Sequence, residues 1–140
     1  MKPSEIENIE LSYLQLEDYQ ELKSAMIQAY KSMPEAYWRE SQIESLIDKF
    51  PEGQVVIKIN GSIAGCALAI IVNYDGITDK HTYKEITDNF TFRTHTYDGD
   101  VLYGIDVFIM PQFRGLRLGR RLYDYRKELC EKLNLRGIAF

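Results

Sequence analysis

The stretch that constrains this chain most runs from residue 101 to residue 133. Its first part, Val101–Ile109, is almost entirely apolar and predicts a buried strand. Pro111 follows, and because proline cannot donate to a sheet ladder, the strand is expected to end before it. A glycine-containing turn occupies 114–119, and leucines at helical spacing then predict a helix over Leu116–Leu133.

The backbone N–H groups at the start of such a helix lack partners and point toward one spot in front of it. Together with the positive end of the helix dipole, they suit a phosphate. Four arginines stand in the same turn: Arg114, Arg117, Arg120 and Arg121. We therefore interpret the turn as an anion-binding site. The alternative is an ordinary β–α corner with basic residues in solvent.

The distribution of charge favours a compact anionic ligand. The 140 residues are enough for a single domain over 1–140, and they carry a formal net charge of −4. That charge argues against nucleic acid as a partner. Residues 1–50 hold five bases and ten acids, whereas 112–127 hold six bases and one acid. A basic island in an acidic chain fits one small anion better than a polymer; a solvated basic helix face is the alternative interpretation.

Cysteine usage and apolar runs bear on the compartment. Cys66 and Cys130 belong to no metal-ligand pair, and we interpret them as buried thiols in a reducing environment. The start, Met1–Glu7, has no apolar signal core, and the apolar run Ala64–Val72 is too short to span a membrane. We therefore expect a cytoplasmic protein without membrane contact.

Three strands are predicted before the β–α corner and one after it. They are expected at Ile9–Leu16, Gln54–Ile59, Ile63–Val72 and Arg136–Phe140. Asn60 and Gly61 separate the second from the third, and because both accept positive φ angles they predict a tight hairpin turn.

Two helices are predicted between the first strand and the hairpin. The first covers 18–31 and begins with a capping box between Asp18 and Glu21. The second begins with a capping box over 32–35 and ends before Pro51.

A long excursion over Asp75–Asp100 separates the hairpin from the β–α corner, and we expect a short helix in it near Thr82–Asp88. Its two histidines, His81 and His95, are not spaced as metal ligands, so we expect surface positions for both and no metal site.

The β–α corner resembles motif A of the GNAT acetyltransferase superfamily, whose signature is Arg/Gln-x-x-Gly-x-Gly/Ala after a strand. Arg114 and Gly119 meet it, Gly115 matches the frequent Arg-Gly opening, and Arg117 stands where glycine is commonest. The order of predicted elements is also similar to that family over the whole chain. The stretch Asp100–Phe140 looks like the N-terminal acetyltransferase region of bacterial proteins that carry a carbon–nitrogen hydrolase domain.

This resemblance implies an α/β (α+β) fold with a mixed central sheet flanked by helices. The family's usual last helix and last two strands are missing, so the resemblance implies a C-terminally incomplete domain. We expect such a chain to transfer acetyl groups poorly and to form a homodimer through its uncovered sheet edge.

The implied function is acetyl-CoA-dependent N-acetyltransfer to an amine of unknown identity. The alternative is an acetyl-CoA-binding or docking module, attached to a hydrolase domain and without turnover. In the family the turn wraps the cofactor's pyrophosphate, which assigns to it Arg114, Gly115, Leu116, Arg117, Leu118, Gly119 and Arg120. The preceding strand holds the pantetheine arm and the thioester carbonyl through the backbone of Val107, Phe108 and Ile109.

Asp106 is the carboxylate best placed to take a proton from the amine, and the alternative is a structural pairing with a core or helix partner. Tyr103 is a second candidate base. No general acid is assigned. Met33, Tyr37 and Trp38 fall between the two predicted helices, where they line either the acceptor pocket or the core.

Overall fold

The computed structural model describes residues 3–33, 35–74, 85, 87, 91, 92 and 94–139. Within them, five strands form one sheet in the order β1-β2-β3-β4-β5. Their bounds are β1 (Ile9–Tyr13), β2 (Val55–Ile59), β3 (Ser62–Val72), β4 (Val101–Ile109) and β5 (Gly137–Ala139). Neighbouring strands are antiparallel from β1 to β4, and β5 joins β4 in parallel. The prediction of a mixed sheet is confirmed.

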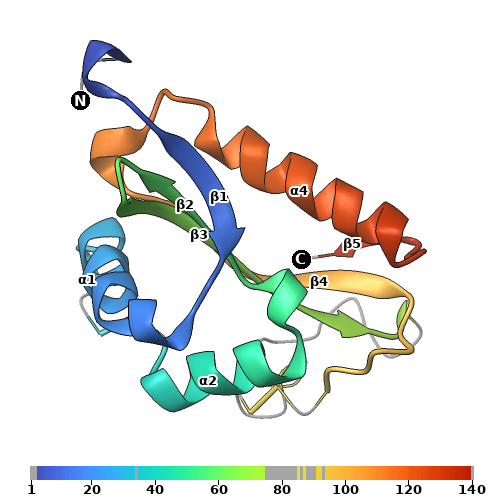
Figure 1. Cartoon of the computed structure of the whole chain (residues 1–140). Helices are drawn as coiled ribbons and strands as arrows, with labels where there is room; N and C mark the ends of the chain where they lie inside the picture. Colours follow the sequence, from blue (N-terminus) through green and yellow to red (C-terminus); the bar gives the residue numbers. More distant parts are fainter. Residues whose placement is uncertain are drawn as a thin grey trace.

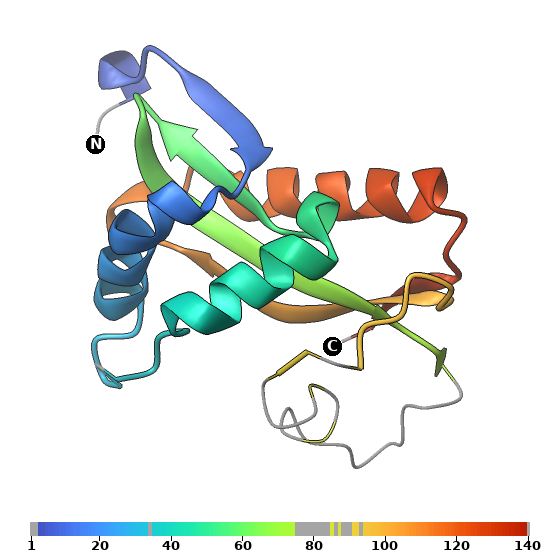
Figure 2. The same cartoon turned by 60° about the horizontal axis from the view of Figure 1, so that its bottom comes forward.

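Helices cover both faces of this sheet, as predicted. The α-helices of the described residues are α1 (Tyr19–Ala29), α2 (Glu40–Lys49) and α4 (Leu118–Lys132). Figures 1 and 2 show α1 and α2 on one face and α4 on the other. Short 3-10 turns join the elements: η1 (Pro3–Glu5), η2 (Leu16–Asp18), η3 (Pro51–Gly53) and η5 (Pro111–Phe113).

Two apolar clusters hold the layers together. The larger joins α1, α2 and the start of α4 to the sheet, and the smaller lies between the sheet and the second half of α4. Cys66 and Cys130 are free and buried, as predicted, and burial raises the pKa of the Cys66 thiol. Within the described residues, no helix combines the length and apolarity that crossing a membrane requires.

The strand predictions hold to within a few residues. β4 has the predicted bounds, and the hairpin turn has Asn60 at φ 51° and Gly61 at φ 85°, as the sequence indicated. β1 is shorter than predicted because the chain enters η2 soon after Tyr13. Of the predicted last strand, Gly137–Ala139 is formed and pairs with β4, while Phe140 lies outside the described residues.

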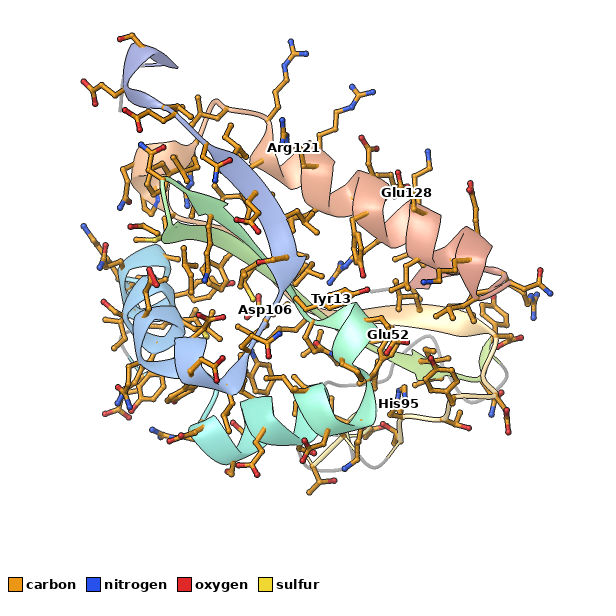
Figure 3. All side chains as sticks on the ribbon, viewed as in Figure 1. Tyr13, Glu52, His95, Asp106, Arg121 and Glu128 are labelled. Carbon is orange, nitrogen blue, oxygen red and sulfur yellow. The ribbon has the colours of Figure 1, made fainter. Side chains whose placement is uncertain are left out.

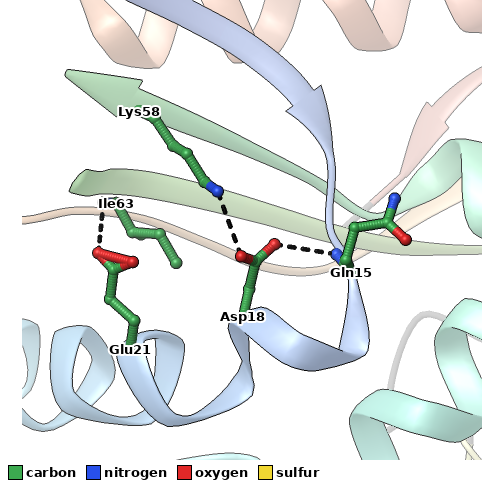
Figure 4. Close-up of polar contacts among 5 residues, drawn as sticks. All are labelled: Gln15, Asp18, Glu21, Lys58 and Ile63. Atoms are coloured by element: carbon green, nitrogen blue, oxygen red, sulfur yellow. Dashed lines mark hydrogen bonds and ion pairs between the residues drawn. The ribbon is translucent and has the colours of Figure 1, made fainter. Parts of the chain in front are cut away.

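The predicted capping box at the start of α1 is wrong. The Asp18 carboxylate instead accepts from the Gln15 backbone N–H at 3.1 Å and pairs with the Lys58 ammonium at 3.2 Å. The Glu21 carboxylate accepts from the backbone N–H of Ile63 at 2.9 Å. Figure 4 shows that both acids join α1 to neighbouring segments. Asp18 therefore closes the start of η2 instead of α1, and the tertiary partners Lys58 and Ile63 take up the two carboxylates as well.

The predicted start of the second helix is also wrong. α2 begins at Glu40, after an irregular segment over 35–39, and Pro34 of the expected capping box lies outside the described residues. The side-chain oxygen of Gln42 accepts from the Arg39 backbone N–H at 2.8 Å, which closes the helix start there. The end before Pro51 is confirmed.

The excursion before β4 is described only in part. His81 and most of the short helix expected near Thr82–Asp88 lie outside the described residues. His95 is not the surface residue that was predicted. Its ring stacks on Phe50 with 5.2 Å between centroids, and its Nδ1 accepts from the backbone N–H of Ile71 at 3.0 Å. Burial lowers the pKa of this imidazole.

Candidate active site

The predicted turn lies between β4 and α4. The helix begins at Leu118, two residues later than predicted, because Arg117 has φ 60° and ψ 31° and cannot belong to a right-handed helix. Gly115 has φ 90°. Left-handed backbone costs a non-glycine residue roughly 1–2 kcal/mol. This explains why glycine would suit position 117, where the sequence departs from the family motif.

Gly119 lies in the first turn of α4, where a glycine costs about 1 kcal/mol relative to alanine in a helix. A Cβ built on it would meet nothing within 4 Å, so the packing of the chain does not require this glycine. The space in front of it is a cavity of about 230 Å³ between β4 and α4. Its lining is Val107, Gly119, Leu122, Tyr123 and Arg126.

β4 and β5 separate beside this cavity. β5 pairs only with Val101–Tyr103, so 104–109 have no partner on that edge among the described residues. On the other edge, the backbone N–H of Met110 donates to the carbonyl of Ala64 in β3 at 2.8 Å. Because backbone groups alternate along a strand, those of Val107 and Ile109 face the unpaired edge and those of Phe108 face β3. Of the three backbone positions expected to hold the cofactor, two are therefore oriented toward open space.

A β-bulge interrupts β4 next to the same point. Leu68 pairs with Asp106 and Ala69 with Gly104, so Ile105 is the extra residue. As a result, Ile105 and Asp106, although consecutive, both line a cavity on the α1–α2 face. Val107 lies on the α4 face. The bulge thus brings Ile105 onto the same face as Asp106, whereas Asp106 and Val107 alternate as in a regular strand.

Arg126 fixes this bulge from the opposite side. One of its terminal nitrogens, Nη2, donates to the carbonyl of Leu68 at 2.7 Å and to that of Asp106 at 3.3 Å. The side chain is buried, which lowers the pKa of the guanidinium, and its Nε has no hydrogen-bond partner among the described residues. The sequence analysis assigned Arg126 no role.

The Asp106 carboxylate is held by two neutral donors from the α1–α2 side. The hydroxyl of Tyr30 donates to Oδ1 at 2.7 Å, and the indole Nε1 of Trp38 donates to Oδ2 at 3.1 Å. Figure 3 places Asp106 between the sheet and these two helices. The structural pairing considered for Asp106 is therefore present, and the same carboxylate also lines the cavity.

The cavity on the α1–α2 face has a volume of about 550 Å³, within the range of small-molecule sites. Its lining is Tyr30, Met33, Glu35, Ala36, Tyr37, Trp38, Arg39, Gln42, Ile105 and Asp106. Of the two alternatives left open for Met33, Tyr37 and Trp38, all three line this cavity, and Tyr37 and Trp38 also pack against the core.

The other expected site residues divide into exposed and packed ones. Arg114, Arg117, Arg120 and Arg121 are all exposed at the turn, and Arg120 approaches Asp124 at 3.9 Å. Leu116 is half-buried and Leu118 buried. Tyr103, the second candidate base, is buried in the core and lines neither cavity.

Sequence reasoning missed Tyr30 and Arg126. Tyr30 follows α1 directly, and nothing in the local pattern separates it from the helix's buried face. Arg126 did carry a signal, because an arginine falls on the apolar stripe of a helix between Leu122 and Leu129. A charged side chain at such a position requires buried acceptors.

Comparison with known proteins gives one family. The model of the acetyltransferase (GNAT) family matches residues 19–140. Two proteins of Bacillus subtilis (strain 168) are similar: the probable hydrolase YhcX, 38% identical over 101 residues, and the uncharacterized N-acetyltransferase YkwB, 37% identical over 95 residues. The matches cover 72% and 68% of this chain, but only 20% of YhcX and 42% of YkwB.

Solved structures repeat the fold at low sequence identity. The loading GNATL domain of CurA from Lyngbya majuscula has a TM-score of 0.73 and 21% identity, over 88% of this chain and 58% of that one. A GNAT family acetyltransferase from Brucella melitensis, solved with acetyl-CoA, has a TM-score of 0.58 and 15% identity, over 94% and 73% of the two chains. The predicted fold class is therefore confirmed.

Proposed function

This chain belongs to the acetyltransferase (GNAT) family, whose members bind acetyl-CoA or CoA, and from that premise we propose that it transfers an acetyl group to the nitrogen of an amine. The observation that carries the proposal is the position of Asp106 and Val107. These neighbours in β4 line two different cavities on opposite faces of the sheet. A donor on one face and an acceptor on the other would meet at this point of the strand.

The acetyl donor, acetyl-CoA, is assigned to the α4 face in this proposal. The backbone N–H groups at the start of α4, the exposed arginines of the turn and the open space at Gly119 suit the pyrophosphate of acetyl-CoA. The arm of the cofactor then runs along the unpaired edge of β4. Backbone N–H groups of Val107 and Ile109 face that edge and can hold the arm and polarise the thioester carbonyl.

The amine that receives the acetyl group is assigned to the cavity that Asp106 lines. The amine arrives as an ammonium ion and gives one proton to the carboxylate, which passes it to solvent. The neutral nitrogen attacks the carbonyl carbon, the C–N bond forms and the C–S bond breaks. The second proton leaves the nitrogen and ends on the thiolate, so the products are an amide, CoA and one released proton.

Several further properties are proposals of the same kind. Two free buried cysteines fit a reducing cytoplasm. β5 is the last strand of the described sheet, and its outer edge suits pairing with a second copy. The similarity to YhcX supports a setting beside a hydrolase domain, and the overall negative charge supports a small acceptor rather than nucleic acid.

A thermal-shift comparison of CoA, acetyl-CoA and ATP tests the donor site. Ligand at a hundred times its dissociation constant adds about 2.7 kcal/mol to the unfolding free energy, so CoA is expected to raise the melting temperature and ATP to raise it less. An amine screen that follows released thiol tests transfer. A shift with CoA but no thiol release with any amine would favour the non-catalytic binding module. If saturating CoA left the melting temperature unchanged, the proposed function would be refuted.

A further inference from the structure

We infer that the acceptor is a singly charged primary amine on an apolar, aromatic-sized body. The inference rests on the proposed function and adds the class of acceptor. It starts from the charge of Asp106. Among the residues that the structure describes, this carboxylate receives two neutral donors, from Tyr30 and Trp38, and forms no ion pair within 4.0 Å. The buried Arg126 interacts with it only through the strand, from the opposite face.

A carboxylate in such a position attracts a cation. Because it is half-buried, its interaction with a bound charge is screened less than that of a surface group. The two donors hold both carboxylate oxygens in place, and an ammonium can approach them from the cavity. The interior wall therefore provides one anchoring site for one positive charge.

Most of the remaining lining is aromatic or apolar. Tyr30, Tyr37 and Trp38 contribute rings, and Ile105 and the exposed Met33 contribute apolar surface. Half-buried Gln42 adds one amide, whose oxygen accepts from the Arg39 backbone N–H. Aromatic faces attract ammonium groups and also pack against an apolar body. The Tyr37 ring already shows the first property, since Lys23 Nζ lies 4.8 Å and the Arg39 guanidinium carbon 4.6 Å from its centre.

Charges at the rim limit the acceptor further. Glu35 and Arg39 are exposed and of opposite sign, and Lys23 adds a second cation beside the Tyr37 ring, so the rim carries no excess of negative charge. The guanidinium of Arg39 also donates to the Tyr37 hydroxyl at 2.6 Å. Polyamines and aminoglycosides carry several charges and would need several interior carboxylates. An acidic acceptor would meet Asp106 with like charge. A monoamine satisfies the one interior charge and fills the apolar remainder.

The chain supplies its own reporter for a direct binding test. Trp38 is its single tryptophan, and its indole donates to Asp106, so emission should change when a cation takes its place beside that carboxylate. Three ligands with nearly the same body differ in charge at pH 7: 2-phenylethylamine is a cation, 2-phenylethanol is neutral and 3-phenylpropanoate is an anion. Titration of the unmutated chain is expected to give at least about tenfold tighter binding of the cation than of the alcohol, equivalent to 1.4 kcal/mol.

Variants identify the group responsible. Asp106→Asn keeps the shape and the acceptor oxygen but removes the charge, and it is expected to reduce the preference for the cation to less than twofold. Asp48→Asn makes the same change at an exposed position on α2 and should leave the preference intact. Melting temperatures of both variants show whether each is folded.

The outcomes separate this inference from the proposed function. Equal affinity for amine and alcohol, or tighter binding of spermidine or of a lysine-containing peptide, would overturn the acceptor class. If acetyl-CoA still raised the melting temperature and some other amine released thiol, the transferase function would stand without it. Binding of 2-phenylethylamine with no thiol release would instead support the acceptor site and count against transfer.

Discussion

Arg126 and Asp106 lie on opposite faces of β4, yet the Arg126 guanidinium donates to the Asp106 backbone carbonyl at 3.3 Å. The same nitrogen donates to Leu68 across the bulge at 2.7 Å. A buried charge on one side of the sheet thereby holds the backbone that directs a carboxylate to the other side. The packing of α4 and the geometry of the proposed acceptor cavity are coupled through this contact.

Arg126→Met is expected to loosen the bulge, because methionine fills the space without donating. Hydrogen bonds from charged groups contribute about 1.5–3 kcal/mol, and a loss of unfolding free energy in that range is expected in urea titrations. Turnover should fall by at least about tenfold through the amine KM and kcat. CoA affinity should fall as well, because Arg126 also lines the cavity proposed for the cofactor.

Lys132→Met also removes one positive charge from α4, but at an exposed position near its end. It should change neither the unfolding free energy nor the turnover. Arg126→Lys, which keeps a donor, should recover part of the turnover. If Arg126→Met lost stability but kept full turnover at a temperature where it is folded, the contact would matter only for the fold.

The fold was largely predictable because its elements carry their own periodicity. Val101–Ile109 was assigned correctly, since a continuous apolar run bounded by proline has few other structures. The local caps were not predictable. Asp18 and Glu21 match a helix-start pattern, but Lys58 and Ile63, distant in sequence, take the same carboxylates. For a side chain with several possible partners, the tertiary structure decides which partner it binds.

Asp106→Asn tests the proposed base. In a protein that turns over an amine, kcat/KM is expected to fall by about 10² or more, the usual contribution of a positioned base. CoA affinity should stay the same, because Asp106 lines the cavity on the face opposite α4. Steady-state kinetics and calorimetry measure the two quantities. Unchanged turnover from pH 6 to pH 9 would assign Asp106 a structural role only.

Gly119→Ala separates stability from ligand affinity. Because a Cβ meets nothing within 4 Å and alanine favours helix over glycine, the melting temperature without ligand should stay equal or rise. CoA affinity should fall, since the methyl group enters the space proposed for the pyrophosphate. Gly137→Ala, also in open space but on β5, is the matched control. Equal CoA affinity in both variants would remove Gly119 from the cofactor site.

His95 is expected to make stability depend on pH. Burial lowers its pKa below 6.5, so between that value and the lowered one the unfolded chain binds more protons than the folded chain. The unfolding free energy should therefore fall as pH decreases from 7 to 5.5, and less steeply in His95→Gln. His81→Gln removes the other histidine and serves as control. Hydrogen bonds, first from the Tyr74 backbone N–H and then from Arg136, lower the pKa of the Asp100 carboxyl, so its contribution to stability is lost only at lower pH.

The candidate site was predictable only where it depends on the β–α corner. Gly119 and the arginines follow from a local motif, and Asp106 from its place in a strand. The bulge at Ile105 leaves no mark in the sequence, and simple alternation counted from Tyr103 in the first half of the strand would place Asp106 on the α4 face. Tyr30 and Arg126 reach Asp106 from elements far away along the chain, so only the folded structure associates them with it.

The two cavities beside β4 also have a kinetic meaning. Each is lined from its own face of the sheet, so neither reactant has to pass through the space that the other occupies. Steric access therefore imposes no obligatory order of addition on the proposed reaction, and its two products can depart independently. In the proposed reaction the strand is a shared wall between two separately filled cavities, and the two-carbon group crosses at its unpaired edge.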